Sequence, residues 1–393
     1  MKKLLLPLLL LLLLALPAHA DTARDVTDEC RIVVVNNKQN NSRYLHDRNE
    51  ITLVSTGTYR NPRIEITTGS TPVAAVFVEF ARTFMPFEVQ HLEGKKWVTV
   101  GRSNEGFAQL YAEFPPQTGR LRLVFDSGVR ALSLAVDELY LFSEGERDET
   151  IAHIWQPTVE KADILFLTTH PDDEILWFGG AIPTYAGARG MRTAVVYATC
   201  DVHYRMQELL NGLWHCGVRT YPVIGNFNDF CTFRYEDVLL NWGEKALTDF
   251  LVRQIRAMQP EVLVTQDLNG EYGHANHIAV ARTCVKAVHL AADESYAGGG
   301  SLAEFGPWQV KKFYVHLGEK PTTVMDWHVP LDSFGGKDAY QVAVEAFAFH
   351  HSQAGDKYHV HDVGEPYDSS LYTLLFSTVG EDVAGKDFFE NLE

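Results

Sequence analysis

The sequence has few cysteines and few basic residues for its length. It contains five cysteines in 393 residues, and no two of them have CxxC spacing. A zinc site built from thiolates is therefore disfavoured, and the odd count leaves at least one thiol free or paired with another chain. Lys and Arg together number 34 against 51 Asp and Glu, which gives a formal net charge of -17. This balance argues against nucleic acid or an anionic membrane surface as a partner.

Long apolar runs are absent after the first twenty residues. Lys2 and Lys3 precede a leucine-rich run from Leu4 to Leu16, and Ala18-His19-Ala20 has the small-x-small pattern of a cleavage site. The run is shorter than the about 20 residues that a membrane-spanning helix needs. We therefore interpret residues 1–20 as a secretory signal peptide and not as an anchor. We expect an exported protein, periplasmic or secreted, with no membrane segment in the mature chain.

Residues 21–148 have the pattern of an all-β domain. Short runs of β-branched and aromatic residues, several of them alternating with polar residues, lie between turn clusters such as Asn40-Asn41 and Ser127-Gly128. Such runs at regular spacing predict a β-sandwich. The expected strands are residues 31–35, 51–54, 76–80, 97–100, 121–125 and 132–136.

Residues 149–393 have a different pattern, which begins after a charged linker at residues 143–149. Near-continuous apolar strands alternate with helical stretches, which predicts a Rossmann-like α/β domain with a parallel sheet and helices on both faces. Ligand sites in such sheets lie beyond the carboxyl ends of the strands. The expected strands are 163–169, 192–199, 221–224 and 261–265, and the expected helices start at about 176 and cover 204–216, 244–258 and 278–292.

Two polar clusters follow strands of this second domain. The segment His170-Pro171-Asp172-Asp173-Glu174 follows the first strand, and Tyr272-Gly273-His274-Ala275-Asn276-His277 follows the fourth and opens a helix. A helix cap would explain one carboxylate of the first cluster. Together the clusters offer two imidazoles and a carboxylate to one metal ion, for which Zn²⁺ is expected and another divalent metal is the alternative. A position is left for water, whose pKa falls to about 7 on zinc. A carboxylate beside that water can take its proton, and a histidine can stabilise the oxyanion or protonate the leaving amine.

These two motifs, in this order, resemble the PIG-L/LmbE-like family of zinc-dependent N-acetylglucosamine deacetylases over about residues 160–390. Three further segments fit the resemblance. Arg205 to Glu208 is similar to an RxxE element, Asp229 to an acidic loop position, and His350 to Gln353 to a C-terminal HxSQ signature.

The resemblance implies a role for each matching residue. It implies that the zinc ligands are His170, Asp173 and His277 and that the general base is Asp172. It implies that His274 is the acid or oxyanion stabiliser and that Tyr272 lies near the substrate carbonyl. The implied substrate contacts are Arg205, Glu208 and Asp229. Two positions depart from the commoner pattern, since Ala275 stands for Pro and Asn276 for Asp. Asn276 carries no charge with which to raise the pKa of His274.

A looser resemblance concerns the β-domain. Residues 77–142, with the runs 97–101 and 138–142, are similar to discoidin-type carbohydrate-binding modules. The domain can hold the enzyme on a glycan, or it can pack on the α/β domain and shape the cleft. The short linker and the lack of an aromatic cluster favour the packing role.

The sequence thus predicts zinc-dependent hydrolysis of the N-acetyl group of an amino sugar or glycan, which gives acetate and a free amine. The alternatives are another zinc amidase that acts on an acylated amine or sugar conjugate, and a non-catalytic carbohydrate-binding protein. We expect Trp177 and Phe178 to be core residues of the first helix, although they can also line a sugar pocket. We also expect a disulfide between Cys200 and Cys231, because their loops leave the same sheet edge.

Overall fold

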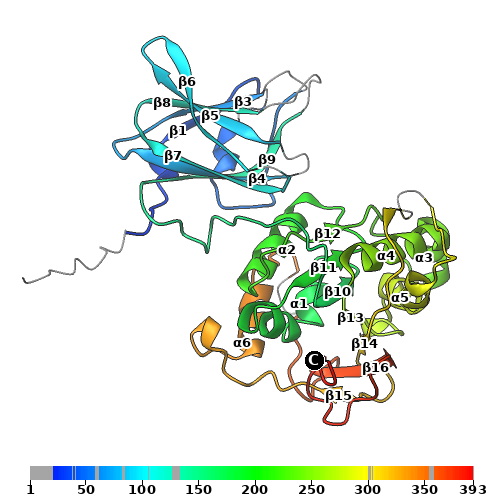
Figure 1. The fold of residues 1–393 in the computed structure, drawn as a ribbon. Coiled ribbons are helices and arrows are strands. Elements are labelled where there is room, and N and C mark those ends of the chain that lie inside the picture. Colours follow the sequence, from blue (N-terminus) through cyan, green and yellow to red (C-terminus); the bar gives the residue numbers. More distant parts are fainter. Residues whose placement is uncertain are drawn as a thin grey trace, which may run out of the picture.

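The computed structural model describes residues 21–392 except 38, 40, 58–61, 82–84, 105, 126–132, 300–301, 303 and 354–357. The expected signal peptide, Asn40 and the turn at Ser127-Gly128 lie outside the described residues. The described chain forms a β-sandwich followed by an α/β domain, as the sequence predicts (Figure 1).

The sandwich consists of two antiparallel sheets in the described residues, with strand orders β1-β3-β8-β5-β6 and β2-β9-β4-β7. Buried and exposed side chains alternate along β1, and the buried ones face the interior of the sandwich. Ile32 and Val34 are buried, while Arg31 and Val33 are exposed. Of the expected strand 51–54, only its last residue is in a strand. The strands are β1 (Arg31–Val34), β2 (Val54–Ser55), β3 (Arg63–Thr67), β4 (Val73–Phe80), β5 (Phe87–Glu93), β6 (Lys96–Arg102), β7 (Gln109–Gln117), β8 (Arg120–Phe125) and β9 (Ala135–Phe142). The short 3-10 helices η1 (Thr27–Glu29) and η2 (Ser42–Leu45) accompany them.

The sheet of the α/β domain has the strand order β12-β11-β10-β13-β14-β16-β15. The first five of these are parallel, which confirms the Rossmann-like prediction. The sheet is nevertheless mixed, because β16 runs antiparallel to both β14 and β15. The strands are β10 (Ile164–Thr168), β11 (Thr193–Tyr197), β12 (Val223–Ile224), β13 (Val262–Thr265), β14 (Lys312–His316), β15 (Thr323–Val324) and β16 (Leu371–Ser377).

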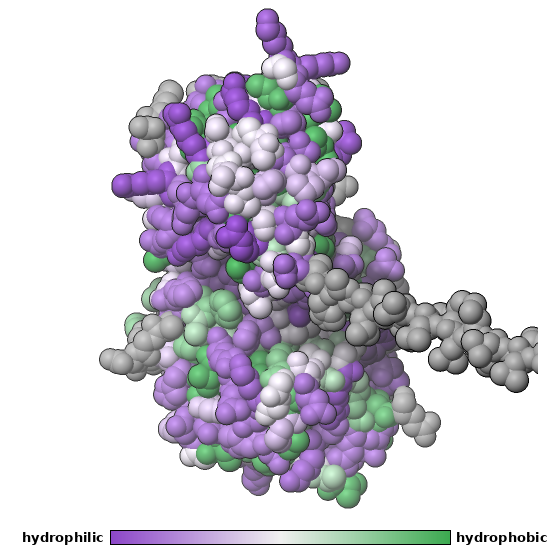
Figure 2. Space-filling view, turned by 90° about the vertical axis from the view of Figure 1, so that its left-hand side faces the viewer, coloured by the Kyte–Doolittle hydropathy of each residue, from purple (hydrophilic) through white to green (hydrophobic). Residues whose placement is uncertain are grey.

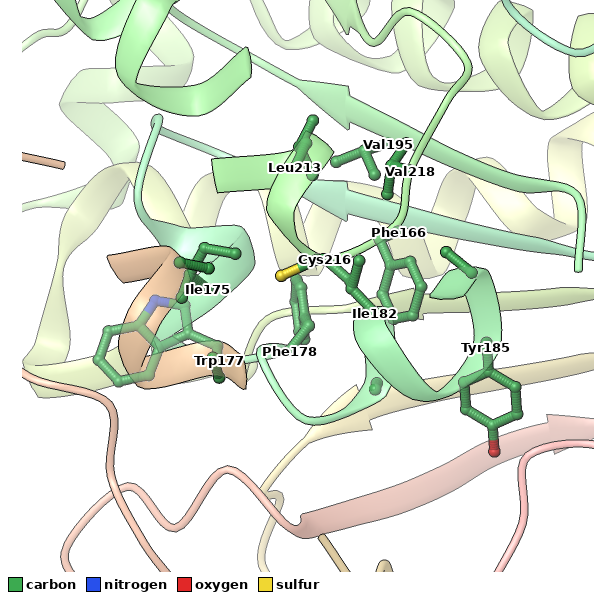
Figure 3. Close-up of a cluster of buried hydrophobic side chains, with 14 of the residues drawn as sticks. Phe166, Ile175, Trp177, Phe178, Ile182, Tyr185, Val195, Leu213, Cys216 and Val218 are labelled. Carbon is green, nitrogen blue, oxygen red and sulfur yellow. The ribbon is translucent and has the colours of Figure 1, made fainter. Parts of the chain in front are cut away.

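Helices cover both faces of this sheet because both faces of its central strands are apolar. Ile164 and Phe166 of β10 belong to the core under α1, α2 and α6, while Leu165 and Leu167 belong to the core under α3, α4 and α5. Figure 3 shows the first of these cores, with Phe178 and Cys216 packed near Phe166. The helices are α1 (Asp173–Leu176), the π-helical η3 (Pro183–Ala188), α2 (His203–His215), α3 (Tyr235–Trp242), α4 (Glu244–Met258), η4 (Glu271–Gly273), α5 (Ala275–Ala292), η6 (Asp332–Phe334) and α6 (Ala339–Phe347).

Two expectations about this domain were wrong. The first helix begins at Asp173 and not at about 176, because the chain turns sharply at Asp172, whose φ is 106°. The Cys200–Cys231 disulfide is not formed, since all five cysteines are free. Cys216 and Cys284 are buried in the hydrophobic cores, where they act as small apolar residues.

The sandwich packs directly against α2, the helix of the α/β domain nearest to it in Figure 1. Gln207 Nε2 donates to the carbonyl of Phe80 at 3.0 Å, and Asn211 Nδ2 donates to Glu50 Oε1 at 3.1 Å. Figure 2 shows the two parts in contact, with mostly hydrophilic side chains over this face of the molecule. Among the described helices, none combines the length and apolar character that a membrane crossing requires.

Candidate metal centre and active site

The two polar motifs meet at the carboxyl edge of neighbouring strands. His170 follows β10 and His277 lies in the first turn of α5, shortly after β13, which pairs in parallel with β10. His170 Nδ1 lies 3.1 Å from His277 Nε2 and 3.3 Å from Asp173 Oδ2. His277 Nε2 lies 3.2 Å from Asp173 Oδ1. The sequence-predicted ligand set therefore converges on one point.

These separations fit a tetrahedral zinc ion. Ligands about 2.0–2.1 Å from a metal in tetrahedral geometry lie about 3.3 Å from one another. All three side chains are buried, and Trp177 Nε1 donates to Asp173 Oδ1 at 3.0 Å. Two imidazole nitrogens facing each other beside a carboxylate need a proton or a cation between them. The residues present fit a metal ion on this chemistry.

The charges around His277 favour a cation at the same point. Burial disfavours a charged imidazole, but Asp173 and Glu271 outweigh it and raise the pKa of His277 to about 10. Burial also opposes ionisation of Asp173, yet His277 and His170 hold the pKa of that carboxyl well below its usual range. The site thus stabilises one positive charge among these groups.

Residues behind the ligands fix their orientation. Glu271 Oε2 lies 2.9 Å from His277 Nδ1, and Glu271 Oε1 lies 2.9 Å from Nδ1 of the buried His316. Asp229 Oδ1 lies 3.4 Å from His170 Nε2 and accepts from the amide of Asn276 at 3.1 Å. Carboxylates behind ligating imidazoles set the tautomer and raise metal affinity. Asp229 therefore lies behind the predicted ligand His170, while its predicted substrate contact stays a prediction.

Asp172 lies beside the ligands and is held by a cation. Its Oδ1 is 3.0 Å from Arg205 Nη2, and its side chain makes no cap bond to α1, which removes the helix-cap interpretation. Burial and the neighbouring Asp173 raise the pKa of Asp172 to about 7, against the lowering effect of Arg205. Its positive φ is strained for a residue with a side chain, and such strain is common at functional sites. Glu174 holds this turn, because its Oε2 accepts from the Asp172 N–H at 2.8 Å.

His274 and Tyr272 line a cavity of about 470 Å³ next to these ligands. His274 Nδ1 is buried and has no hydrogen-bond partner among the residues that the structure describes, and burial together with His277 and His170 lowers the pKa of His274 to about 4. The imidazole is therefore neutral near pH 7 in this structure. Tyr272 has a left-handed backbone (φ 47°), and its partly exposed side chain lines the cavity. Trp177 lines the same cavity and is also a core residue, whereas Phe178 belongs to the core.

Two residues of the C-terminal HxSQ signature contact buried glutamates, one on α2 and one in the first motif. Ser352 donates through its N–H and its hydroxyl to the two oxygens of Glu208, each at 2.7 Å. His350 Nε2 lies 2.9 Å from Glu174 Oε1. Glu208 is 1% exposed, and both of its carboxylate oxygens accept hydrogen bonds from Ser352. The structure therefore does not bring Glu208 to the cavity. Arg205 is directed at Asp172, and the substrate roles of both residues stay predictions.

Sequence reasoning missed Glu271, Glu174 and His316. Glu174 ends the first motif next to the predicted ligand Asp173, and Glu271 directly precedes the second motif, so their acidic side chains were a usable signal. His316 is the last residue of β14, a strand that the apolar pattern of the sequence did not predict. Its position at the same sheet edge depends on strand pairing that no local pattern encodes.

Comparison with known proteins agrees with these motifs. Residues 165–288 match the family model described as PIG-L: GlcNAc-PI de-N-acetylase, so the chain contains a PIG-L family domain. It is 30% identical to a 1D-myo-inositol 2-acetamido-2-deoxy-alpha-D-glucopyranoside deacetylase from Thermobispora bispora, with 38% of this chain and 57% of that protein covered. A protein of the same name from Streptomyces avermitilis is 28% identical, with 40% and 62% covered. The chain thus spans little more than half the length of these relatives.

Solved structures show weaker likeness. N,N'-diacetylchitobiose deacetylase from Pyrococcus horikoshii aligns at a TM-score of 0.37 and 18% identity, with 52% of this chain and 75% of that chain covered. A conserved protein from Thermus thermophilus aligns at 0.36 and 21%, with 49% and 80% covered. The carbohydrate-binding module CpGH89CBM32-6 from Clostridium perfringens aligns at 0.26 and 16%, with 31% and 100% covered. At these TM-scores the likeness supports no argument.

Proposed function

We propose that this protein is a zinc-dependent hydrolase that removes the acetyl group from an N-acetylated amino sugar. The convergence of His170 Nδ1, Asp173 and His277 Nε2 within 3.1 to 3.3 Å of one another is the observation that carries the proposal. The PIG-L domain and the names of the curated relatives support deacetylation of a compound that contains N-acetylglucosamine. We further propose that residues 1–20 direct the protein to export.

His170, Asp173 and His277 would hold the zinc ion. When bound, Zn²⁺ would make hydroxide available near neutral pH and polarise the amide carbonyl. Asp172 takes the proton of the attacking water, since it is the carboxylate beside the ligands that is not itself a ligand. Arg205 keeps Asp172 oriented through the 3.0 Å ion pair.

His274 acts on the other side of the reacting carbonyl in this proposal. Its buried Nδ1 has no hydrogen-bond partner among the described residues, which leaves the imidazole available to another group. A neutral imidazole can donate one hydrogen bond to a developing oxyanion without carrying charge. Asn276 is compatible with this role, because the role does not require the pKa of His274 to be raised.

The cavity wall suits a sugar ring. Trp177, Tyr272, Tyr358 and Tyr367 line it, and their rings offer apolar faces of the kind that a pyranose can stack on, with polar edges that can form hydrogen bonds. This aromatic wall favours an amino sugar over an arbitrary acylated amine. It does not distinguish N-acetylglucosamine from N-acetylgalactosamine or a monomer from an oligomer.

The test combines zinc content with acetate release. The wild type should hold one tightly bound zinc ion and release acetate from at least one of N-acetylglucosamine, N-acetylgalactosamine and their oligomers. His170→Ala and His277→Ala should lose zinc on dialysis, whereas Asp172→Asn should keep it and lose about 10²-fold in turnover. His289→Ala, on the exposed face of the same helix as His277, is the matched control. Full zinc occupancy in both ligand variants, or near-normal turnover in Asp172→Asn, would exclude the assignment.

A further inference from the structure

A second group of histidines and a carboxylate lies outside the proposed catalytic centre. His359, His361 and Glu365 belong to the irregular segment between α6 and β16. His359 Nε2 lies 3.3 Å from Glu365 Oε2, and His361 Nδ1 lies 3.6 Å from the same oxygen. One ligand atom from each of the three residues lies within 4.8 Å of the other two.

Nδ1 of His361 has no hydrogen-bond partner among the described residues. His361 Nδ1 is buried and makes no hydrogen bond, since 3.6 Å to Glu365 is too long for one. A buried imidazole nitrogen without a partner is destabilising. The ring is also held in place, because it stacks on Trp177 at 6.0 Å between centroids and 12° between planes. An imidazole fixed in this way is oriented before any ligand arrives.

We propose that His359, His361 and Glu365 bind a second divalent transition-metal ion, for which Zn²⁺ is the best match. Two imidazoles and a carboxylate are a common zinc ligand set, and ligand atoms in such sites lie about 3.3 Å apart. The side chains of His359 and Glu365 are 59% and 44% exposed, so the ion exchanges with solvent and a water completes its coordination. The site shares no ligand with the His170–Asp173–His277 centre.

The second site lies on the wall of the proposed substrate cavity. His359 and His361 line that cavity together with Tyr272 and His274, whereas Glu365 does not line it. A metal ion between them narrows the cavity from one side. Zinc in excess of the first equivalent is therefore expected to inhibit the deacetylase activity, a consequence that rests on the proposed function.

Zinc binding alone tests the site without any substrate. Metal-free protein is titrated with Zn²⁺ by calorimetry, and its zinc content is measured after equilibration at micromolar free zinc. We expect two equivalents in the wild type, one in His359→Ala/Glu365→Gln, one in His277→Ala, and none when these changes are combined. His46→Ala is the matched control, because His46 also faces a carboxylate, Asp28, at 3.2 Å but has no third ligand in the described part of the chain. It should bind two equivalents.

Equal zinc uptake by the wild type and by His359→Ala/Glu365→Gln overturns the proposal, because the double change should remove one equivalent. Loss of the first equivalent in His277→Ala tests the catalytic centre separately, so the two assignments can fail independently. If deacetylation is found, Glu365→Gln should keep its activity without added zinc and lose the inhibition by excess zinc. Circular dichroism of each variant checks that the fold is retained.

Discussion

Arg205 Nη2 lies 3.0 Å from Oδ1 of Asp172, so a helix that touches the β-sandwich also holds the proposed base. Arg205 is on α2, and Gln207 and Asn211 of the same helix donate to Phe80 and Glu50 of the sandwich. The guanidinium also donates to the carbonyl of Pro171. The sandwich thereby supports the position of a group in the active site without lining the cavity.

Arg205→Ala should retain zinc and lose about 10²-fold in kcat/KM, because a buried carboxylate that loses its cation is protonated or displaced and no longer serves as a base. The kcat/KM of Arg205→Lys should lie between those of the wild type and Arg205→Ala, since lysine restores the charge but lacks the planar guanidinium group with its several donors. Steady-state kinetics on the best small substrate and zinc content give the two readouts. Arg189→Ala, which breaks an exposed pair with Asp387, is the control and should be normal. Wild-type kcat/KM in Arg205→Ala would contradict the role.

Glu271→Gln should weaken zinc binding about 10- to 100-fold while leaving the fold intact, because a carboxylate behind a ligating imidazole raises its basicity. The change keeps the size of the side chain and removes the charge that faces both His277 and His316. Competition with a chromophoric chelator measures the affinity. Glu261→Gln, whose carboxylate pairs with Lys311 away from the cavity, should bind zinc as the wild type does. An unchanged affinity in Glu271→Gln would show that this contact does not tune the metal.

The interface between sandwich and α2 should lose stability as the pH rises. Burial raises the pKa of Glu50 from 4.5 to about 8, with further contributions from Glu208, Asp137 and Glu138 and an opposing one from His350. Between about pH 4.5 and about pH 8 the unfolded chain ionises this carboxyl while the folded chain keeps it protonated. Folding then takes up a proton, so the free energy of unfolding falls across this window.

Glu50→Gln should flatten that fall. Some slope should remain, because Glu138 has a pKa raised to about 7 by burial and acts in the same direction. Urea unfolding at a series of pH values gives the free energies. Glu93→Gln, an exposed glutamate of the same domain, should keep the wild-type slope. Equal slopes in Glu50→Gln and the wild type would contradict the assignment.

Much of the fold and of the candidate metal centre could be predicted because local patterns encode them. Apolar strands followed at once by polar clusters identify the sheet edge, and the strand order then brings His170 and His277 together. The start of α1 could not be predicted, because it depends on the strained turn at Asp172. The pairing of Glu271 with His316 depends on the neighbouring positions of β13 and β14, which are 45 residues apart at the contact.

The last prediction concerns Gln109, which sequence patterns did not indicate and which joins the two domains. Its side chain is 0% exposed. Its Nε2 lies 3.1 Å from Gln207 Oε1 and 3.0 Å from Asn211 Oδ1 of α2, and its Oε1 accepts from Trp155 Nε1 at 2.8 Å. Replacing it leaves several buried polar groups without partners, at about 1–3 kcal/mol each.

We expect Gln109→Ala to lower both the stability of the whole chain and its activity on a small acetylated sugar, because α2 carries Arg205. Glu113→Gln, an exposed position on the same strand β7, is the control and should change neither. For the same reason, residues 150–393 expressed alone should be poorly soluble or weakly active even on a monosaccharide. The packing role of the sandwich requires this result, since removal of residues 21–149 uncovers Gln207 and Asn211. A soluble fragment with full activity on the small sugar and a loss only on a polymer would instead show that the sandwich is a targeting module.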